Sequence, residues 1–137
     1  MKIAWFTPFY LQSAIGQVSK LVCEELHKDY ELDIYTFNHK ESISSSLPVI
    51  RYNSSNIDFR SLDHYDYVIY NMGNFAGNHK EIWEVMCQYP GILVLHDQLM
   101  QNFSSYVPSK PKQDLITRMR HVREGLRFKN NFLRIKS

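Results

Sequence analysis

The fold is decided by residues 65–97, which read YDYVIYNMGNFAGNHKEIWEVMCQYPGILVLHD. The aromatic and β-branched run from Tyr65 to Met72 predicts a strand, which Gly73 and Asn74 end. The run from Ile92 to Leu95 is apolar throughout and predicts a second strand, buried on both faces. Two such strands in one short stretch indicate a sheet at the centre of the domain.

A helical pattern separates these two strands and ends at Pro90 and Gly91. Charged residues lie between its apolar residues, which are Ile82, Trp83, Val85, Met86 and Tyr89. Strands that alternate with helices, with central strands apolar on both faces, imply a parallel sheet covered on two sides. We therefore expect an α/β fold of Rossmann-like form.

The same alternation extends towards the N-terminus. Further strands are predicted over Lys2–Phe6, Glu31–Phe37 and Pro48–Tyr52. After Gly16 the spacing predicts an amphipathic helix of about three turns, whose apolar side would face the core. The apolar residues of that helix are Val18, Leu21, Val22 and Leu26. Residues 1–108 are therefore expected to form one Rossmann-like domain.

Beyond Pro108 the pattern changes to one basic amphipathic helix, roughly Lys112 to Lys129. Its apolar residues recur at steps of four, three and four, at Leu115, Met119, Val122 and Leu126. They form a narrow stripe that some other surface must cover. Residues 109–137 are therefore predicted to be a helical extension of the same domain.

The charge is distributed unevenly along the chain. Residues 110–137 hold nine Lys or Arg and two acidic residues, a balance of +7, whereas residues 1–109 hold seven and twelve, a balance of −5. A basic helix on an acidic body has three interpretations: packing on its own domain, contact with a membrane or partner, and nucleic-acid binding. We rank them in that order, and no nucleic-acid partner is expected.

Length and composition indicate one soluble or peripheral domain. The chain has 137 residues, 44% of them hydrophobic, and no apolar run approaches the roughly 18 residues of a membrane span. Cys23 and Cys87 stand at apolar positions of predicted helices, where buried free thiols are the ordinary interpretation. We expect a cytoplasmic protein, with peripheral membrane contact through the basic helix as an option.

Polar residues and glycines stand where ligands bind in open parallel sheets, just beyond the strands. The candidates are Gly16, Asn71, Gly73, Asn74, His96 and Asp97. His96 could be an acid, a base or a hydrogen-bond donor, or Asp97 could cap a short helix with His96 in the core. Gly16 could admit an anion to the helix amides or only relieve a turn. Gly73 and Asn74 fit turn chemistry as well as the hydroxyl-rich face of a sugar.

Several common sites have no signature in this sequence. The loop after the first strand contains neither a dinucleotide fingerprint nor a P-loop. The two cysteines form no C-x-x-C pair, and no ligand spacing links the other histidines, which are His27, His39, His64, His79 and His121. We therefore expect no metal and no cofactor.

Two parts of the chain together resemble family 4 glycosyltransferases. The segment KIAWFTP at residues 2–8, with the loop to Gly16, resembles the opening of these enzymes. More specifically, YNMGN at residues 70–74 and YPGILVLHD at residues 89–97 are similar to the family pattern Y-x-x-G-N…P-G-[IV]-x-V-L-H-D. The resemblance covers about residues 1–105.

The resemblance implies the N-terminal, acceptor-side half of a retaining, metal-independent enzyme of the GT-B fold. In such enzymes a second domain holds most of the nucleotide-sugar donor. Gly16 would then lie near the donor phosphates, and His96 and Asp97 would be the catalytic residues. The remaining acceptor-side residues would be Asn71, Gly73 and Asn74.

The sequence departs from the family in two places. Ile15 precedes Gly16, where many relatives have a second glycine, and no donor-binding E-x-x-x-x-x-x-x-E pattern follows Asp97. This chain alone is therefore expected to be inactive, and a C-terminal domain or a partner chain would supply the other half. Its substrates would be a nucleotide-sugar and a glycan or lipid-linked acceptor. Two alternatives stay open: a non-catalytic Rossmann-like ligand-binding module, and a subunit that docks on a partner chain.

Overall fold

Five parallel strands form one sheet in the computed structural model, which describes residues 1–37 and 41–106. The strands are β1 (Lys2–Phe6), β2 (Glu31–Phe37), β3 (Val49–Tyr52), β4 (Tyr67–Met72) and β5 (Ile92–Leu95). Their order across the sheet is β3-β2-β1-β4-β5, and every neighbouring pair is parallel. The predicted Rossmann-like α/β class is therefore confirmed. The basic helix and the extension over 109–137 lie outside the described residues.

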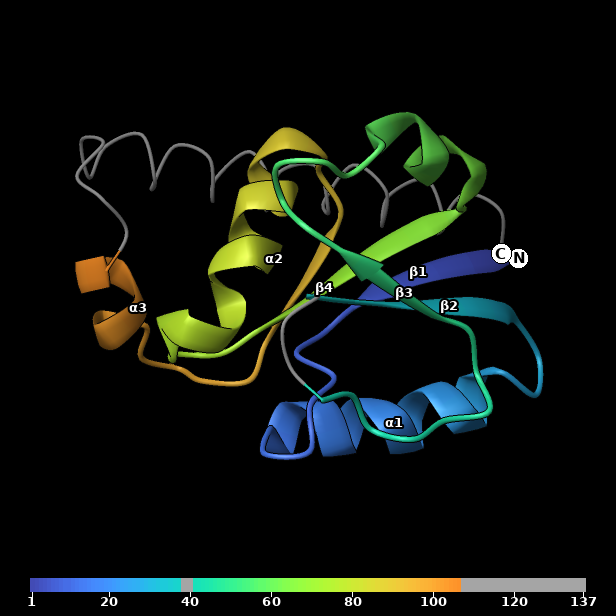
Figure 1. The fold of residues 1–137 in the computed structure, drawn as a ribbon, viewed down its shortest axis with the longest axis horizontal. Helices are drawn as coiled ribbons and strands as arrows, with labels where there is room; N and C mark the ends of the chain where they lie inside the picture. Colours follow the sequence, from blue (N-terminus) through green and yellow to red (C-terminus); the bar gives the residue numbers. More distant parts are fainter. Residues whose placement is uncertain (38–40, 107–137) are drawn as a thin grey trace, which may run out of the picture.

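Helices cover the two faces of this sheet. They are α1 (Ala14–Leu26), the 3-10 helix η1 (Phe59–His64), α2 (Ala76–Gln88) and the short α3 (Gln101–Tyr106). Figure 1 shows α1 on one side of the sheet, and α2 and η1 on the other. Among the described residues, no helix has the length and apolar character that crossing a membrane requires. Between β1 and β4 the strand order reverses, which is where ligands bind in folds of this kind.

Aromatic side chains fill the core on the α2 side of the sheet. The rings of Phe6 and Tyr35 stack with their centroids 4.6 Å apart, and Tyr52 meets Phe6 edge-on at 5.2 Å. Tyr70 is fully buried, and its hydroxyl donates to the Tyr89 carbonyl at 2.6 Å, which ties β4 to the end of α2. The packed rings and the hydrogen bond of the Tyr70 hydroxyl fix the position of β4 relative to α2.

The opposite core lies under α1, and there the structure differs from the predicted helix face. The helix packs on the sheet through Gly16, Ser19 and Cys23, whereas Val18 and Leu21 are 49% and 68% exposed. Small residues allow this close approach, because a Cβ atom added at Gly16 would lie 2.4 Å from the Pro8 carbonyl oxygen. The prediction that the apolar side of this helix faces the core is therefore wrong for Val18, Leu21 and Val22.

Neither Cys23 nor Cys87 forms a disulfide within the described residues. Cys23 is fully buried, as predicted, and burial raises the pKa of its thiol to about 12. Cys87 is only half-buried on α2. The thiol of Cys23 therefore stays protonated and behaves as a small apolar core residue.

Candidate functional site

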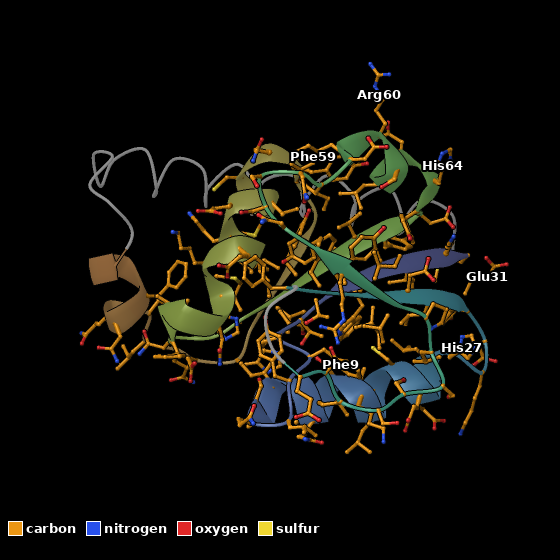
Figure 2. All side chains as sticks on the ribbon, in the orientation of Figure 1. Phe9, His27, Glu31, Phe59, Arg60 and His64 are labelled. Atoms are coloured by element: carbon orange, nitrogen blue, oxygen red, sulfur yellow. The ribbon has the colours of Figure 1, made fainter. Side chains whose placement is uncertain are left out.

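The carboxyl ends of β4 and β5 meet at one edge of the sheet, which we call the β4–β5 edge. Met72 and Leu95, the last residues of the two strands, are paired across them. Asn71 is the residue before the last in β4, and four further predicted site residues follow the strands, namely Gly73, Asn74, His96 and Asp97. Figure 2 shows His64 and Glu31 at the opposite end of the sheet, with their side chains pointing away from it. The structure therefore brings five of the six predicted site residues together.

Asn71 is the centre of this edge, and its side chain is 1% exposed. Its Nδ2 atom donates to the Phe6 carbonyl at 3.0 Å, and its Oδ1 atom lies 3.1 Å from Nε2 of His96. Because a carbonyl can only accept, the amide orientation is fixed, and Nε2 of His96 must carry the proton that Oδ1 accepts. In the neutral imidazole, Nδ1 of His96 then has a lone pair available to a ligand. His96 is exposed, so the alternative in which it is satisfied in the core is wrong.

His79, in the first turn of α2, lies beneath this edge and was not predicted as a site residue. Its Nδ1 atom lies 3.3 Å from the backbone oxygen of Asn71, and the residue is 2% exposed. Burial lowers the pKa of His79 to about 4, although the hydrogen bond to Asn71 and the charge of Asp97 oppose the shift. His79 is therefore neutral near pH 7 and donates through Nδ1 to Asn71.

Gly73 is the point at which three side chains converge. A Cβ atom added there would lie 2.7 Å from Ile15 Cδ1, 2.9 Å from His79 Nε2 and 3.0 Å from Asp97 Oδ2. Two of these distances are shorter than real Cβ contacts, so a larger residue at this position would require the neighbouring side chains to move. Gly73 thus permits the close packing of these side chains at the edge, and its backbone φ is not positive.

Asn74 joins the edge to α3. Its backbone N–H donates to Asp97 Oδ2 at 2.6 Å, while its own Oδ1 accepts from the N–H groups of Asn102 and Phe103 at 3.0 and 3.1 Å. Asn74, not Asp97, therefore satisfies the first turn of α3, and the capping role considered for Asp97 is wrong. Asp97 is exposed, and this contact holds one of its two carboxylate oxygens.

Gly16 stands in the first turn of α1, apart from the other five residues. Its N–H donates to the Ser13 hydroxyl at 3.1 Å, as an N-cap contact, and Gly16 is buried. The neighbouring Ile15 reaches Gly73, so the first turn of α1 lies beside the end of β4. The position of Gly16 near donor phosphates stays a prediction.

Phe75 is a second residue that was not predicted to belong to the site. It precedes α2, is 65% exposed, and makes no side-chain cap with that helix. Its ring lies over Gly77, where an added Cβ atom would be 2.8 Å from Phe75 Cε1. A large exposed aromatic ring next to polar groups is a common feature of binding sites. The sequence signal was its place directly after Gly73 and Asn74.

Within residues 1–37 and 41–106, no three His, Cys, Asp or Glu side chains are grouped so that they could hold a metal ion. No protein-family model, curated protein or solved structure matches the chain. The chemistry of the β4–β5 edge therefore rests on its own residues: one oriented imidazole, one carboxylate, the buried amide of Asn71, the half-buried amide of Asn74 and one exposed ring.

Proposed function

We propose that this chain is the acceptor-side half of a glycosyltransferase, and that the β4–β5 edge binds the sugar acceptor. The orientation of His96 by Asn71 is the observation that supports it most. The Asn71 Oδ1 atom, 3.1 Å away, accepts a hydrogen bond from the Nε2–H group of His96, so Nδ1 can accept a proton or hydrogen bond from a sugar hydroxyl.

Asp97 and Phe75 support a carbohydrate as the ligand. Sugars offer neighbouring hydroxyls, which a carboxylate and an imidazole next to each other in the chain can bind together. They also offer an apolar ring face, which an exposed aromatic ring such as Phe75 can cover. An apolar metabolite would use the ring but make no hydrogen bond with Asp97 or with Nδ1 of His96.

The donor would be bound mainly outside this chain. The nucleotide-sugar would be held by a C-terminal domain or a partner chain, with Gly16 near its phosphates, and this chain alone would not transfer sugar. The catalytic assignment of His96 and Asp97 rests on the same proposal. A cytoplasmic location would keep the thiols of Cys23 and Cys87 reduced.

Saturation-transfer NMR on the chain tests this proposal with defined probes. The panel consists of the methyl glycosides of glucose, galactose, mannose and N-acetylglucosamine, together with UDP-glucose and GDP-mannose. We expect at least one glycoside to bind with a millimolar Kd, about ten-fold tighter than either nucleotide-sugar. His96→Ala should abolish that signal.

The matched control is His64→Ala, an exposed histidine at the amino end of the sheet. It should bind the glycoside as the unchanged chain does. Preferential binding of the nucleotide-sugars would support a general ligand-binding module instead. Glycoside binding that survives His96→Ala, or no glycoside binding at all, would overturn the proposal.

A further inference from the structure

The three sides of α1 have different characters. Gly16, Ser19 and Cys23 share the side that packs on the sheet, and they recur at the i, i+3 and i+7 spacing of one helix face. Gln17, exposed, begins the polar side, which continues through Lys20 and Glu24; these last two form an ion pair at 3.7 Å. The third side is apolar, with Ile15, Val18 and Val22. Within the part of the chain that the structure describes, Val18 and Val22 on this third side remain exposed.

The apolar side of α1 faces β4 and β5. Ile15 Cδ1 reaches the end of β4, as its proximity to Gly73 shows, so the residues above it on the same side point in that direction. Val22 is 38% exposed and Val18 49% exposed, although both are apolar. The described residues therefore leave this side of the helix uncovered.

The sheet next to α1 is also incompletely covered. Ile69 packs against the α1-side core, and it pairs with Ile92 on the edge strand, so the two side chains share a face. Val94, two residues further on, shares that face as well. All three are only half-buried, and α1 is the one described helix on this side of the sheet in Figure 1. Parallel sheets normally have both faces covered.

Ile15 of α1 lies beside Gly73 at the end of β4, and we call the two surfaces together the open apolar face. It consists of Ile15, Val18, Val22, Ile69, Ile92 and Val94. Isolated exposed apolar residues are ordinary, but a contiguous set on a helix and the adjacent strands indicates a covering element.

The sequence contains an apolar segment long enough to cover this face. The stripe from Leu115 to Leu126 advances eleven positions, about 16 Å along a helix, and the apolar side of α1 from Ile15 to Val22 advances seven positions, about 10 Å. Residues 107–137 provide 31 residues after α3, enough for a connection and a helix of that length. The stripe is therefore long enough to cover the apolar side of α1.

Charge favours the same pairing. Residues 110–137 carry a balance of +7, and residues 1–109 carry −5. A helix that buries Leu115, Met119 and Val122 would keep its Arg and Lys residues at the rim, on a body of opposite net charge. A second copy of the chain would instead place two identical apolar faces of equal charge together.

From this complementarity we infer that residues 112–129 of the same chain dock as a helix on the open apolar face, through Leu115, Met119, Val122 and Leu126. The basic segment is then the missing cover of the sheet next to β5. This inference does not depend on sugar binding at the β4–β5 edge.

Photo-cross-linking of the full chain tests the inference. A benzoylphenylalanine at Val22 would face the docked segment, and one at Glu24 would stand on the polar side of the same helix. Cleavage after lysine releases residues 21–28 with either label and residues 113–129 as one peptide, so both variants give the same pair of fragments. We expect the 21–28 to 113–129 cross-link from position 22 at a yield about ten times that from position 24.

Hydrogen exchange provides a second test of the docking and requires no cross-linking label. Amides of residues 113–129 should exchange about ten-fold faster in Val22→Asp than in the unchanged chain, and at the same rate in Glu24→Gln. Val22 is already partly exposed, so the substitution leaves the sheet intact. Equal cross-linking from both positions, a covalent dimer, or exchange that Val22→Asp leaves unaltered would each overturn the inference.

Discussion

The buried amide of Asn71 connects Phe6 and His96, with Nδ2 bound to the Phe6 carbonyl at 3.0 Å and Oδ1 facing His96 Nε2 at 3.1 Å. One side chain thereby joins β1, β4 and the residue after β5. The same residue accepts from His79 through its backbone oxygen. The exposed imidazole is thus oriented by a group that solvent cannot reach, which is how positioned acids and bases are usually held.

Replacing this amide should affect both stability and binding. Asn71→Ala leaves the buried Phe6 carbonyl without its donor, and we expect the free energy of unfolding to fall by about 1–3 kcal/mol. His96 would also lose its fixed tautomer, so glycoside binding should weaken by about ten-fold or more. Urea unfolding and NMR titration measure the two effects. Asn56→Ala, at an exposed asparagine, is the control. An Asn71→Ala protein as stable as this control would contradict the hydrogen bonds assigned to Asn71.

The ring of Phe75 should matter for binding and little for folding. Because Phe75 is 65% exposed, its replacement by alanine should change the free energy of unfolding by no more than about 0.5 kcal/mol. Glycoside affinity should fall about five-fold or more and be restored in Phe75→Tyr, since an aromatic face is what the sugar requires. Leu99→Ala, also on an exposed apolar residue, is the control. Full affinity in Phe75→Ala would exclude the ring from the site.

Stability should fall in mild acid because of His79. Its pKa is lowered to about 4 in the folded protein, whereas the unfolded chain restores a value near 6.5. Between these values the unfolded state binds more protons, so the free energy of unfolding decreases as pH falls from about 6.5 to 4. Above pH 6.5 the lowered pKa of His79 contributes its full amount to the free energy of unfolding, about 3 kcal/mol.

Urea unfolding at about pH 7, 5.5 and 4.5 measures this slope. His79→Gln removes the titrating group and should flatten the dependence, even if the variant is less stable throughout. His64→Gln, at an exposed histidine, should retain it. The assignment fails if His79→Gln and the unchanged chain lose stability equally between these pH values.

Two helical glycines should respond in opposite directions to alanine. Gly16→Ala forces a Cβ atom to within 2.4 Å of the Pro8 carbonyl oxygen, and we expect a loss of stability of about 1–3 kcal/mol. At Gly77 the nearest atoms belong to the exposed Phe75 ring, which can move, so Gly77→Ala should be neutral or stabilising by about 0.5 kcal/mol. Thermal unfolding of both variants checks the pair, and equal losses would contradict the close approach of α1.

The sheet could be predicted because its signal is local. The bounds of β1, β2 and β5 agree with the predicted runs, and β3 and β4 begin one and two residues later, since apolar and β-branched runs mark buried strands. The buried side of α1 could not be predicted by the same reasoning. Its contact depends on how closely Gly16 and Ser19 let the helix approach, and hydrophobicity does not report that distance.

The candidate site shows the same division. Asn71, His96 and Asp97 were found because parallel strands end at one edge, a rule that needs only strand ends. His79 was missed because it stands inside a helix and reaches the edge only through the packing of α2 on β4. Phe75 was missed because exposure, not residue type, makes it available to a ligand.

Long-range ¹H–¹⁵N NMR of the histidine rings during titration with the tightest-binding methyl glycoside tests the central claim most directly. We predict that the Nδ1 signal of His96 shifts as the lone pair of this nitrogen accepts a hydrogen bond from a sugar hydroxyl. The Nε2 signal of His96 should remain that of a protonated nitrogen, and the ring signals of His64 should not move. A ring signal of His96 that is unchanged at glycoside saturation, or a protonated Nδ1 before glycoside is added, would contradict the account.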